Sequence, residues 1–275
     1  MRISTVIPVY KNIDFLLPAV RSVFTSNKYD HQVIIVDDGN EAHTAKKIEN
    51  YKNIPGVEIV RLEKNLGLAN ARNAGLRHAD GNYVRFLDGD DEFTWGGLER
   101  QLECMAKDKT DIVVGRFKLV DRFNEKSWNI EGNNTDPLNL DEAYKSFLFF
   151  WERGLSIPIH SALFKREAII GLGNSAFPTG FRAKEDWIFW CNLARSGAKF
   201  SLISDDTALY RQHGGNMCVS DPYGMARSFL EAAMHLHLHL DDPSDLRSQF
   251  MTSSLDHFFR FYIRVIENRV EQKNK

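Results

Sequence analysis

The sequence predicts an open, mostly parallel α/β sheet of Rossmann-like type, followed by a C-terminal helical extension. Strand-like apolar segments alternate with amphipathic helical segments through about the first 90 residues, as in βαβ units with right-handed crossovers. Residues 33–36 are apolar at every position, which is typical of a parallel strand buried on both faces. After residue 221 the pattern is helical, with a break at 242–244.

The elements of the first third follow from these patterns in chain order. Strands are expected at 3–9, 33–36, 57–62 and 83–87, and helices at 14–27, around 46–48 and at 68–78. The second and fourth strands run directly into acidic loops, at Asp37 and Asp38 and at 88–91. Because ligands bind outside the carboxyl ends of strands in such sheets, the two loops are expected to meet at one site.

The middle of the chain is mixed. We expect a helix from 95 to about 107, strands at 112–114, 117–120, 200–203 and 208–211, a polar loop at 129–136, and helices at 141–153 and 184–196. No internal repeat or low-complexity tract divides this region.

Composition narrows the class of protein. The 275 residues carry 35 Lys and Arg against 37 Asp and Glu, a formal charge of −2, so nucleic acid is not an expected partner. With 43% hydrophobic residues, the chain can form one large domain or two small ones. Three widely spaced cysteines form neither a disulfide framework nor a zinc pattern. Charges interrupt every apolar run, which predicts a cytoplasmic protein.

The loop at 88–91 holds three carboxylates in four residues. Such carboxylates repel one another unless a cation neutralises them or water surrounds them. Oxygen-rich sites of this kind suit Mg²⁺ or Mn²⁺. A solvated acidic turn is the alternative interpretation, because Asp-Gly-Asp is also ordinary turn chemistry.

Four motifs resemble those of the family 2 glycosyltransferases, which have the GT-A fold. They are residues 6–11 (VIPVYK), 36–40 (VDDGN), 65–75 (NLGLANARNAG) and 86–91 (FLDGDD), in that order. The resemblance continues at 184–187 (KEDW) and 210–213 (YRQH). It covers residues 1–216 and implies a catalytic domain there, with a nucleotide-sugar-binding half at 1–91, an acceptor-binding half at 92–216, and a helical extension at 217–275.

The resemblance also implies roles for individual residues. The nucleotide sugar would be held by Pro8, Val9, Tyr10, Asp37, Asp38, Arg72, Asp88 and Gly89. Asp90 and His213 would bind Mn²⁺ or Mg²⁺, and Asp186 would be the catalytic base. Glu185, Trp187 and Arg182 would contact the acceptor.

The chemistry of the residues agrees with these roles. A divalent cation offsets the negative charge that develops on a departing nucleoside diphosphate. Asp186 has aromatic neighbours that could desolvate it and stack on sugars. The alternative for Glu185 and Asp186 is a favourable interaction with a helix dipole. Arg182 and Arg211 are either diphosphate or acceptor contacts or solvated arginines.

The expected activity is transfer of one sugar from a nucleotide sugar, for which a UDP-sugar is the first expectation. The anomeric configuration of the sugar is expected to be inverted. The acceptor would be a glycan or lipid-linked oligosaccharide in capsule, O-antigen, lipopolysaccharide or exopolysaccharide biosynthesis, by family analogy. The chain lacks the Q-x-x-R-W segment of processive polymerases. Two alternatives stay open: a nucleotidyltransferase, although no P-loop motif is present, and a non-catalytic nucleotide- or carbohydrate-binding module.

Two features of the C-terminal part stay open at this point. Residues 256–266 interleave aromatic and basic side chains, which fits a packed helix, a homodimer contact, or an interfacial helix at the inner face of the cytoplasmic membrane. Between 244 and 275 there are six basic and four acidic residues, a surplus too small to anchor the chain by charge alone. His235 and His239 have metal-ligand spacing but no evident third ligand.

Overall fold

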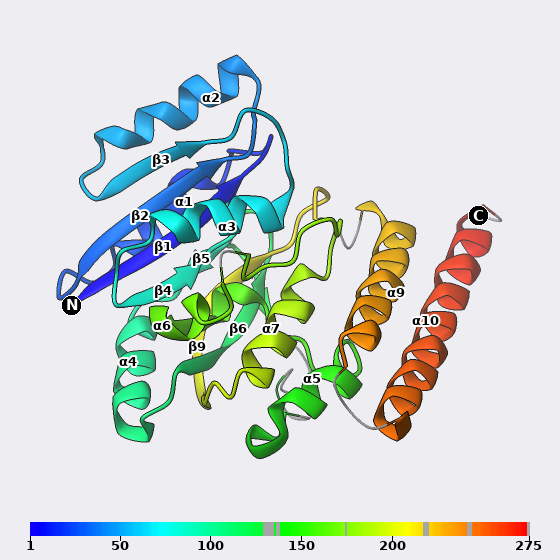
Figure 1. Ribbon diagram of the computed structural model, residues 1–275. Helices are drawn as coiled ribbons and strands as arrows, with labels where there is room; N and C mark the ends of the chain where they lie inside the picture. The colour runs from blue at the N-terminus through cyan, green and yellow to red at the C-terminus, as the bar shows by residue number, and fades with distance from the viewer. Residues whose placement is uncertain (129–134, 136–137, 174, 217–219, 241–243, 274–275) are drawn as a thin grey trace.

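The computed structural model describes residues 1–128, 135, 138–173, 175–216, 220–240 and 244–273. Within them the chain forms a nine-stranded sheet of order β3-β2-β1-β4-β8-β6-β9-β5, with β7 paired to β6 (Figure 1). Helices pack on both faces, which gives three layers. The predicted open, mostly parallel α/β sheet and the helical C-terminal part are therefore confirmed.

The N-terminal half of the sheet is entirely parallel. Its strands are β1 (Arg2–Val9), β2 (Asp30–Asp37), β3 (Val57–Arg61) and β4 (Tyr83–Phe86). β1 pairs with β2 on one side and with β4 on the other, and β2 pairs with β3. The strand order therefore reverses between β1 and β4, and the crevice at such a reversal is where α/β sheets bind ligands.

The other half of the sheet is mixed. It contains β5 (Glu92–Phe93), β6 (Ile112–Val120), β7 (Ser127–Trp128), β8 (Ala162–Lys165) and β9 (Phe200–Arg211). The sequence predicted two short strands in place of β6 and two in place of β9, but each is continuous. The pairing of β6 with β9 shifts register around Arg116, and this irregularity interrupts the apolar pattern without ending the strand. β5, β7 and β8 were not predicted, because strands of two to four residues are too short to show an alternating apolar pattern.

Successive residues of each strand point to opposite faces of the sheet, and helices cover both faces. On one face lie α1 (Leu16–Val23) and α4 (Gly97–Asp108), and on the other α3 (Leu68–His78), α5 (Ala143–Phe150) and α7 (Glu185–Arg195). Val33 and Ile35 pack toward α1, whereas Ile34 and Val36 pack toward α3. This two-sided burial is why the whole run at 33–36 is apolar. The remaining short helices are α2 (Ala42–Glu49), η1 (Asn50–Asn53), η2 (Leu140–Glu142), η3 (Ile159–Ser161) and α6 (Arg166–Ile170).

α3 lies very close to the sheet at Gly75. A Cβ at this position would lie 2.3 Å from Val6 Cγ1 and 3.0 Å from Val36 Cγ2. Only glycine fits such an approach of helix to strand. The close packing fixes the position of α3, which carries Arg72.

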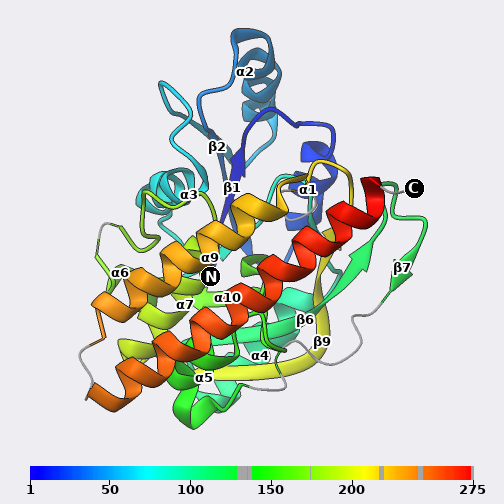
Figure 2. The same ribbon diagram turned by 90° about the vertical axis from the view of Figure 1, so that its right-hand side faces the viewer.

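The C-terminal extension consists of α9 (Pro222–Leu238) and α10 (Ser244–Lys273), which lie side by side (Figures 1 and 2). Phe229 and Phe250 pack against Trp187 of α7, in the same apolar cluster as the sheet residues of that face. The extension therefore shares a core with the first 216 residues. No helix in the described ranges combines the length and apolarity needed to cross a bilayer. The polar loop expected at 129–136 lies, apart from Thr135, outside the described residues.

Arg85 is a buried cation on the α1 and α4 face of the sheet. Arg85 is 3% exposed, and its guanidinium carbon lies 3.3 Å from the centre of the Phe93 ring. Its Nε and Nη2 atoms have no hydrogen-bond partner among the described residues. Burial lowers the pKa of Arg85 to about 9, so the charged form costs folding stability at neutral pH.

We expect Arg85→Met to raise the free energy of unfolding by about 1 to 2 kcal/mol, because an apolar side chain of similar length removes the cost of the buried charge, which exceeds the lost contact with Phe93 and the lost attraction to Glu99. Urea denaturation at pH 7 measures this change. Arg100→Met is the matched control: Arg100 is exposed and ion-paired with Asp205 at 2.7 Å, and its loss should change stability by less than about 1 kcal/mol. A destabilised Arg85→Met protein would contradict the prediction.

Candidate active site

The site lies at the reversal of strand order, where β1 and β4 end. The loop at 88–91 follows β4, and a Cβ on Gly89 would lie 3.4 Å from the carbonyl oxygen of Pro8 and 3.5 Å from Val9 Cγ2. The acidic loop therefore rests directly on the end of β1. Pro8 and Val9 are buried, whereas Tyr10 is exposed at the mouth of the crevice.

Arg72 connects three separate parts of the chain at this point. Its Nη2 donates to Asp88 Oδ1 at 2.8 Å, and its Nη1 donates to Glu185 Oε1 at 2.6 Å. The side chain is 3% exposed and lies over the ring of Phe177. One guanidinium thus joins α3, the acidic loop and the start of α7. Two of the predicted nucleotide-side residues and one predicted acceptor-side residue are brought together here.

Asp37 and Asp38 shape the loops beside the crevice. Asp38 accepts hydrogen bonds from the N–H groups of Leu66 (2.8 Å) and Gly67 (3.0 Å). Asp37 accepts from the backbone N–H and the side-chain amide of Asn40, at 2.8 and 2.7 Å. Both carboxylates are buried, and their hydrogen bonds hold the turns at 38–40 and 65–67 in place.

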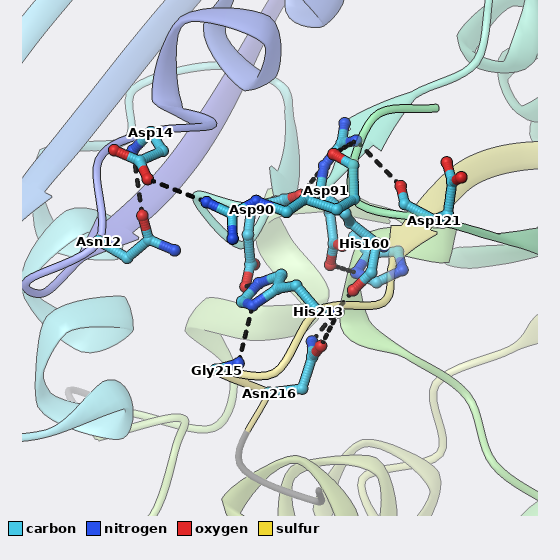
Figure 3. A network of polar contacts seen from close by, with 11 residues as sticks. Asn12, Asp14, Asp90, Asp91, Asp121, His160, His213, Gly215 and Asn216 are labelled. Atoms are coloured by element: carbon cyan, nitrogen blue, oxygen red, sulfur yellow. Dashed lines mark hydrogen bonds and ion pairs between the residues drawn. The ribbon is translucent and has the colours of Figure 1, made fainter. Parts of the chain in front are cut away.

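Asp90 and His213, the predicted metal pair, are adjacent in space (Figure 3). His213 Nε2 lies 2.9 Å from Asp90 Oδ2, and the ring stacks on Phe15. The Gly215 N–H donates to His213 Nδ1 at 3.1 Å, which assigns the ring proton to Nε2, facing Asp90. Coordination of a metal by Nε2 would require this proton to leave.

His160 and Asp91 form a second acid–imidazole pair, which sequence reasoning missed. His160 Nδ1 lies 3.0 Å from Asp91 Oδ2, and both side chains are buried (Figure 3). Burial raises the pKa of Asp91 to about 6 despite the opposing effect of His160. Burial opposes protonation of His160, but Asp91, together with the charges of Asp88 and Asp90, outweighs burial, and the pKa of His160 is raised. A single histidine in an apolar segment carries no motif, so only the fold reveals it.

The donor set at this loop fits a hard divalent cation. Ligand atoms of Asp88, Asp91 and His160 lie within 4.8 Å of one another, in the part of the chain that the structure describes. Burial and the neighbouring charge of Asp88 raise the pKa of Asp90, which means that the ionised form of this carboxyl is disfavoured here unless a positive charge lies beside it. Carboxylate oxygens with an imidazole are ligands suited to Mn²⁺ or Mg²⁺.

Arg211 braces the acidic loop from behind. Its backbone N–H donates to Asp91 Oδ1 at 2.8 Å, its Nε donates to the Asp90 carbonyl at 2.9 Å, and its Nη2 pairs with Glu92. The residue is buried. It is therefore neither a solvated arginine nor placed as a ligand contact, and both interpretations from the sequence are corrected.

The start of α7 presents two carboxylates with different surroundings. Glu185 is buried and bound to Arg72, and burial raises its pKa to about 7 against the opposing charge of Arg72. Asp186 is half-buried, and its Oδ1 accepts the Trp187 N–H at 2.8 Å. Burial also raises the pKa of Asp186, while Lys184 opposes the rise.

The two other predicted acceptor contacts differ in exposure. Trp187 has no exposed surface: its ring stacks on Phe229 and Trp151, and its indole N–H donates to the Phe147 carbonyl at 2.7 Å. This burial corrects the expectation that Trp187 contacts an acceptor, because the ring is a core residue. Arg182 is exposed and pairs with Asp221 at 2.6 Å.

Comparison with known proteins agrees with the fold and shows the family. The model of the family described as "Glycosyl transferase family 2" matches residues 4–172. "Putative teichuronic acid biosynthesis glycosyltransferase TuaG" of Bacillus subtilis is 38% identical over 217 residues, which cover 76% of this chain and 78% of TuaG. An uncharacterised glycosyltransferase of Rickettsia felis is 24% identical over 99% of this chain, which spans only 43% of that protein's length.

Among solved structures, TarS 1-349 of S. aureus in complex with UDP-GlcNAc superposes with a TM-score of 0.70. The sequences are 20% identical, and the match covers 95% of this chain and 73% of TarS 1-349. At this identity the likeness bears on the fold, which is GT-A.

We expect Arg72→Met to lower the free energy of unfolding by about 3 to 5 kcal/mol at pH 8, because it leaves two carboxylates without their buried cation. The loss should be smaller at pH 6. The pKa of Glu185 is already about 7 with Arg72 present, and without the arginine it rises further, so at low pH the carboxyl is neutral and stability falls only as pH rises through that pKa.

Urea denaturation at the two pH values measures this difference. Arg77→Met, an exposed position on the same helix, is the control and should change stability by less than about 1 kcal/mol at either pH. A loss that is equal at pH 6 and pH 8 would contradict the assigned role of Glu185.

Proposed function

This chain belongs to glycosyl transferase family 2, and from that membership we propose that it transfers one sugar from a UDP-sugar to an acceptor hydroxyl, with inversion. The observation that carries the proposal is the double contact of Arg72 with Asp88 and Glu185. It holds the acidic loop, where a donor diphosphate and its metal would lie, beside Asp186, where a proton acceptor is needed. Both lie at the reversal of strand order.

The donor would occupy the crevice between the ends of β1 and β4. Backbone groups of Pro8, Val9 and Tyr10 would contact the nucleotide, within the loops that Asp37 and Asp38 organise. Arg72, Asp88 and Gly89 form the floor. The complex of TarS with UDP-GlcNAc supports a UDP-sugar as the donor.

A divalent cation would bind at the acidic loop, with Asp90 as its main ligand. When bound, Mn²⁺ or Mg²⁺ supplies positive charge to the departing diphosphate. His213, whose Nε2 lies 2.9 Å from Asp90 Oδ2, would be the second ligand once that nitrogen has lost its proton, and Asp88, Asp91 and His160 form a neighbouring group of possible ligands. Arg211 and Arg72 keep the loop in position from the protein side.

Asp186 would serve as the base. As the acceptor oxygen forms a bond to the anomeric carbon, the bond from that carbon to the diphosphate oxygen breaks, its electron pair leaves with UDP, and the hydroxyl proton passes to Asp186. Glu185 is less suited to this role because Arg72 occupies its carboxylate. One displacement from the face opposite the diphosphate inverts the anomeric configuration.

The acceptor would be a glycan or lipid-linked oligosaccharide of the cell surface. The name of TuaG, which places that protein in teichuronic acid biosynthesis, supports this class. The acceptor would approach over residues 92–216 and the extension at 217–275, with exposed Arg182 at the entrance. We place the reaction in the cytoplasm, at the inner face of the membrane, where exposed Phe259 and Ile263 of α10 could contact lipid.

Replacement Asp186→Asn should lower kcat by about 10² to 10⁴-fold, because a neutral amide cannot take the proton. UDP affinity should stay unchanged, since Asp186 is assigned to the acceptor side. Transfer and hydrolysis of a UDP-sugar panel, followed as UDP release, measure the rate, and Asp205→Asn, a carboxylate paired with Arg100 away from the site, is the control. Release of pyrophosphate would indicate a nucleotidyltransferase, and binding without turnover by the unaltered chain would indicate a binding module.

Replacement of the proposed metal ligand Asp90 should abolish the metal-dependent rise in thermal stability that UDP causes. We expect UDP with Mn²⁺ to raise the thermal unfolding temperature of the unaltered chain, because a ligand that binds only the folded state adds RT ln(1 + [L]/Kd). The rise should disappear in Asp90→Asn and in EDTA, and persist in Asp141→Asn, an exposed acid of η2. A UDP shift of equal size with and without metal would overturn the metal assignment.

A further inference from the structure

A pocket lies between α9, α10 and the residue that precedes α7. Its volume is about 150 Å³. Five apolar side chains form its walls: Met225, Ala226 and Phe229 of α9, and Phe258 and Phe261 of α10. None of the roles assigned above uses this pocket. An apolar cavity of roughly this volume accommodates a group about the size of benzene.

One end of the pocket is polar and adjoins the active site. It is formed by Glu152, Lys184 and His257. Lys184 pairs with Glu152, and His257 Nε2 lies 4.0 Å from Glu152 Oε2. Lys184 immediately precedes Glu185 and lies two residues before Asp186 in the chain, so the polar end lies next to the start of α7.

The backbone at this polar end is strained. Lys184 has φ of 71° and Glu152 has φ of 58°, both in the left-handed region that favours glycine. Such strain in non-glycine residues is found at binding sites. Lys184 and Glu152 also shift the pKa of Asp186 in opposite directions, which means that the pair lies within electrostatic range of the base.

We propose that this pocket binds an apolar segment of the acceptor and thereby presents the acceptor hydroxyl to Asp186. The inference rests on the proposed function and adds to it the chemical class of the acceptor: an amphiphile with an alkyl-like chain joined to a hydroxyl-bearing head. The chain enters between α9 and α10, and the head lies at Lys184.

The composition of the walls favours a hydrocarbon segment over a second sugar. A buried sugar needs hydrogen-bond partners for several hydroxyls, whereas the long walls are thioether, methyl and phenyl groups. The charged groups at the polar end are engaged with each other through the Lys184 and Glu152 pair. Methionine and aromatic walls suit a flexible apolar chain.

The pocket is also continuous with apolar surface on α10. Phe258, a wall residue, stacks on Tyr262 with ring centres 5.7 Å apart and contacts Phe259 edge-on. Tyr262, Phe259 and Ile263 are exposed. A hydrocarbon chain longer than the pocket can therefore leave it along a surface that is already apolar. This continuity supports an amphiphile that resides partly in a lipid layer.

The test compares two soluble ligands that share one head group. The probes are n-hexyl β-D-glucopyranoside and methyl β-D-glucopyranoside, titrated calorimetrically into the full chain in the presence of UDP. We expect the hexyl glucoside to bind roughly tenfold or more tightly than the methyl glucoside, because the additional methylenes are buried. Met225→Trp, which fills the pocket, should remove this difference. Met234→Trp, on an exposed turn of the same helix, should preserve it.

Phe261→Ala is the second variant, in case the bulky tryptophan prevents folding. It removes one wall from α10 and should also reduce the preference for the hexyl glucoside. Equal affinity for both glucosides in the unaltered chain, or a hexyl preference that survives in both pocket variants, would overturn the proposal. The affinity for UDP is measured in the same samples. If the unaltered chain binds UDP but does not prefer the hexyl glucoside, the pocket proposal is overturned and the proposed function is not. If the unaltered chain does not bind UDP, the proposed function is overturned.

Discussion

The arrangement of the site depends on one buried cation. Arg72 reaches Asp88, 16 residues away in sequence, and Glu185, 113 residues away. A planar guanidinium can donate to two carboxylates in different directions at once, which a lysine ammonium on a flexible stem does poorly. Because desolvated charges are costly unless paired, the two loops have a strong energetic reason to converge on α3. Gly75, one turn further along α3, lets the helix lie close enough to the sheet for this.

The surroundings of Arg72 explain why the site attracts positive charge. Asp90, Asp91, Glu185 and Asp186 all have raised pKa values, with burial as the main cause. The protein supplies some compensation through Arg72 and through His160, whose pKa is raised, and a cation at the acidic loop would supply more. Such clustering of perturbed acids in a crevice is typical of catalytic sites. The acidic loop would therefore favour a ligand that brings positive charge, such as the metal-bound nucleoside diphosphate of the proposed function.

Rigid support of the loops is a second consequence of the packing. Arg211 binds the acidic loop through its backbone N–H and its guanidinium, and Asp38 holds the turn before α3. These polar contacts are buried or partly buried, where they are stronger than in water and where their loss is costly. The protein's own contacts therefore hold the loops of the crevice, which would suit the alignment of a hydroxyl, an anomeric carbon and a base in the proposed reaction. The extension contributes differently, since α9 and α10 pack on Trp187 of α7.

The sequence by itself determined the alternation of strands and helices, the burial of the parallel strands on both faces, and the placement of acids at strand ends. These are properties of neighbouring residues, expressed as periodicity and turn chemistry. Only the tertiary structure decided that Arg72 bridges Asp88 and Glu185, that Trp187 is a core residue, that Arg211 braces a loop, and that His160 lies against Asp91. Each of these contacts joins residues at least 16 positions apart in the chain, and most join residues 40 or more positions apart. Which buried polar groups find one another depends on how the layers pack, and no local pattern encodes that.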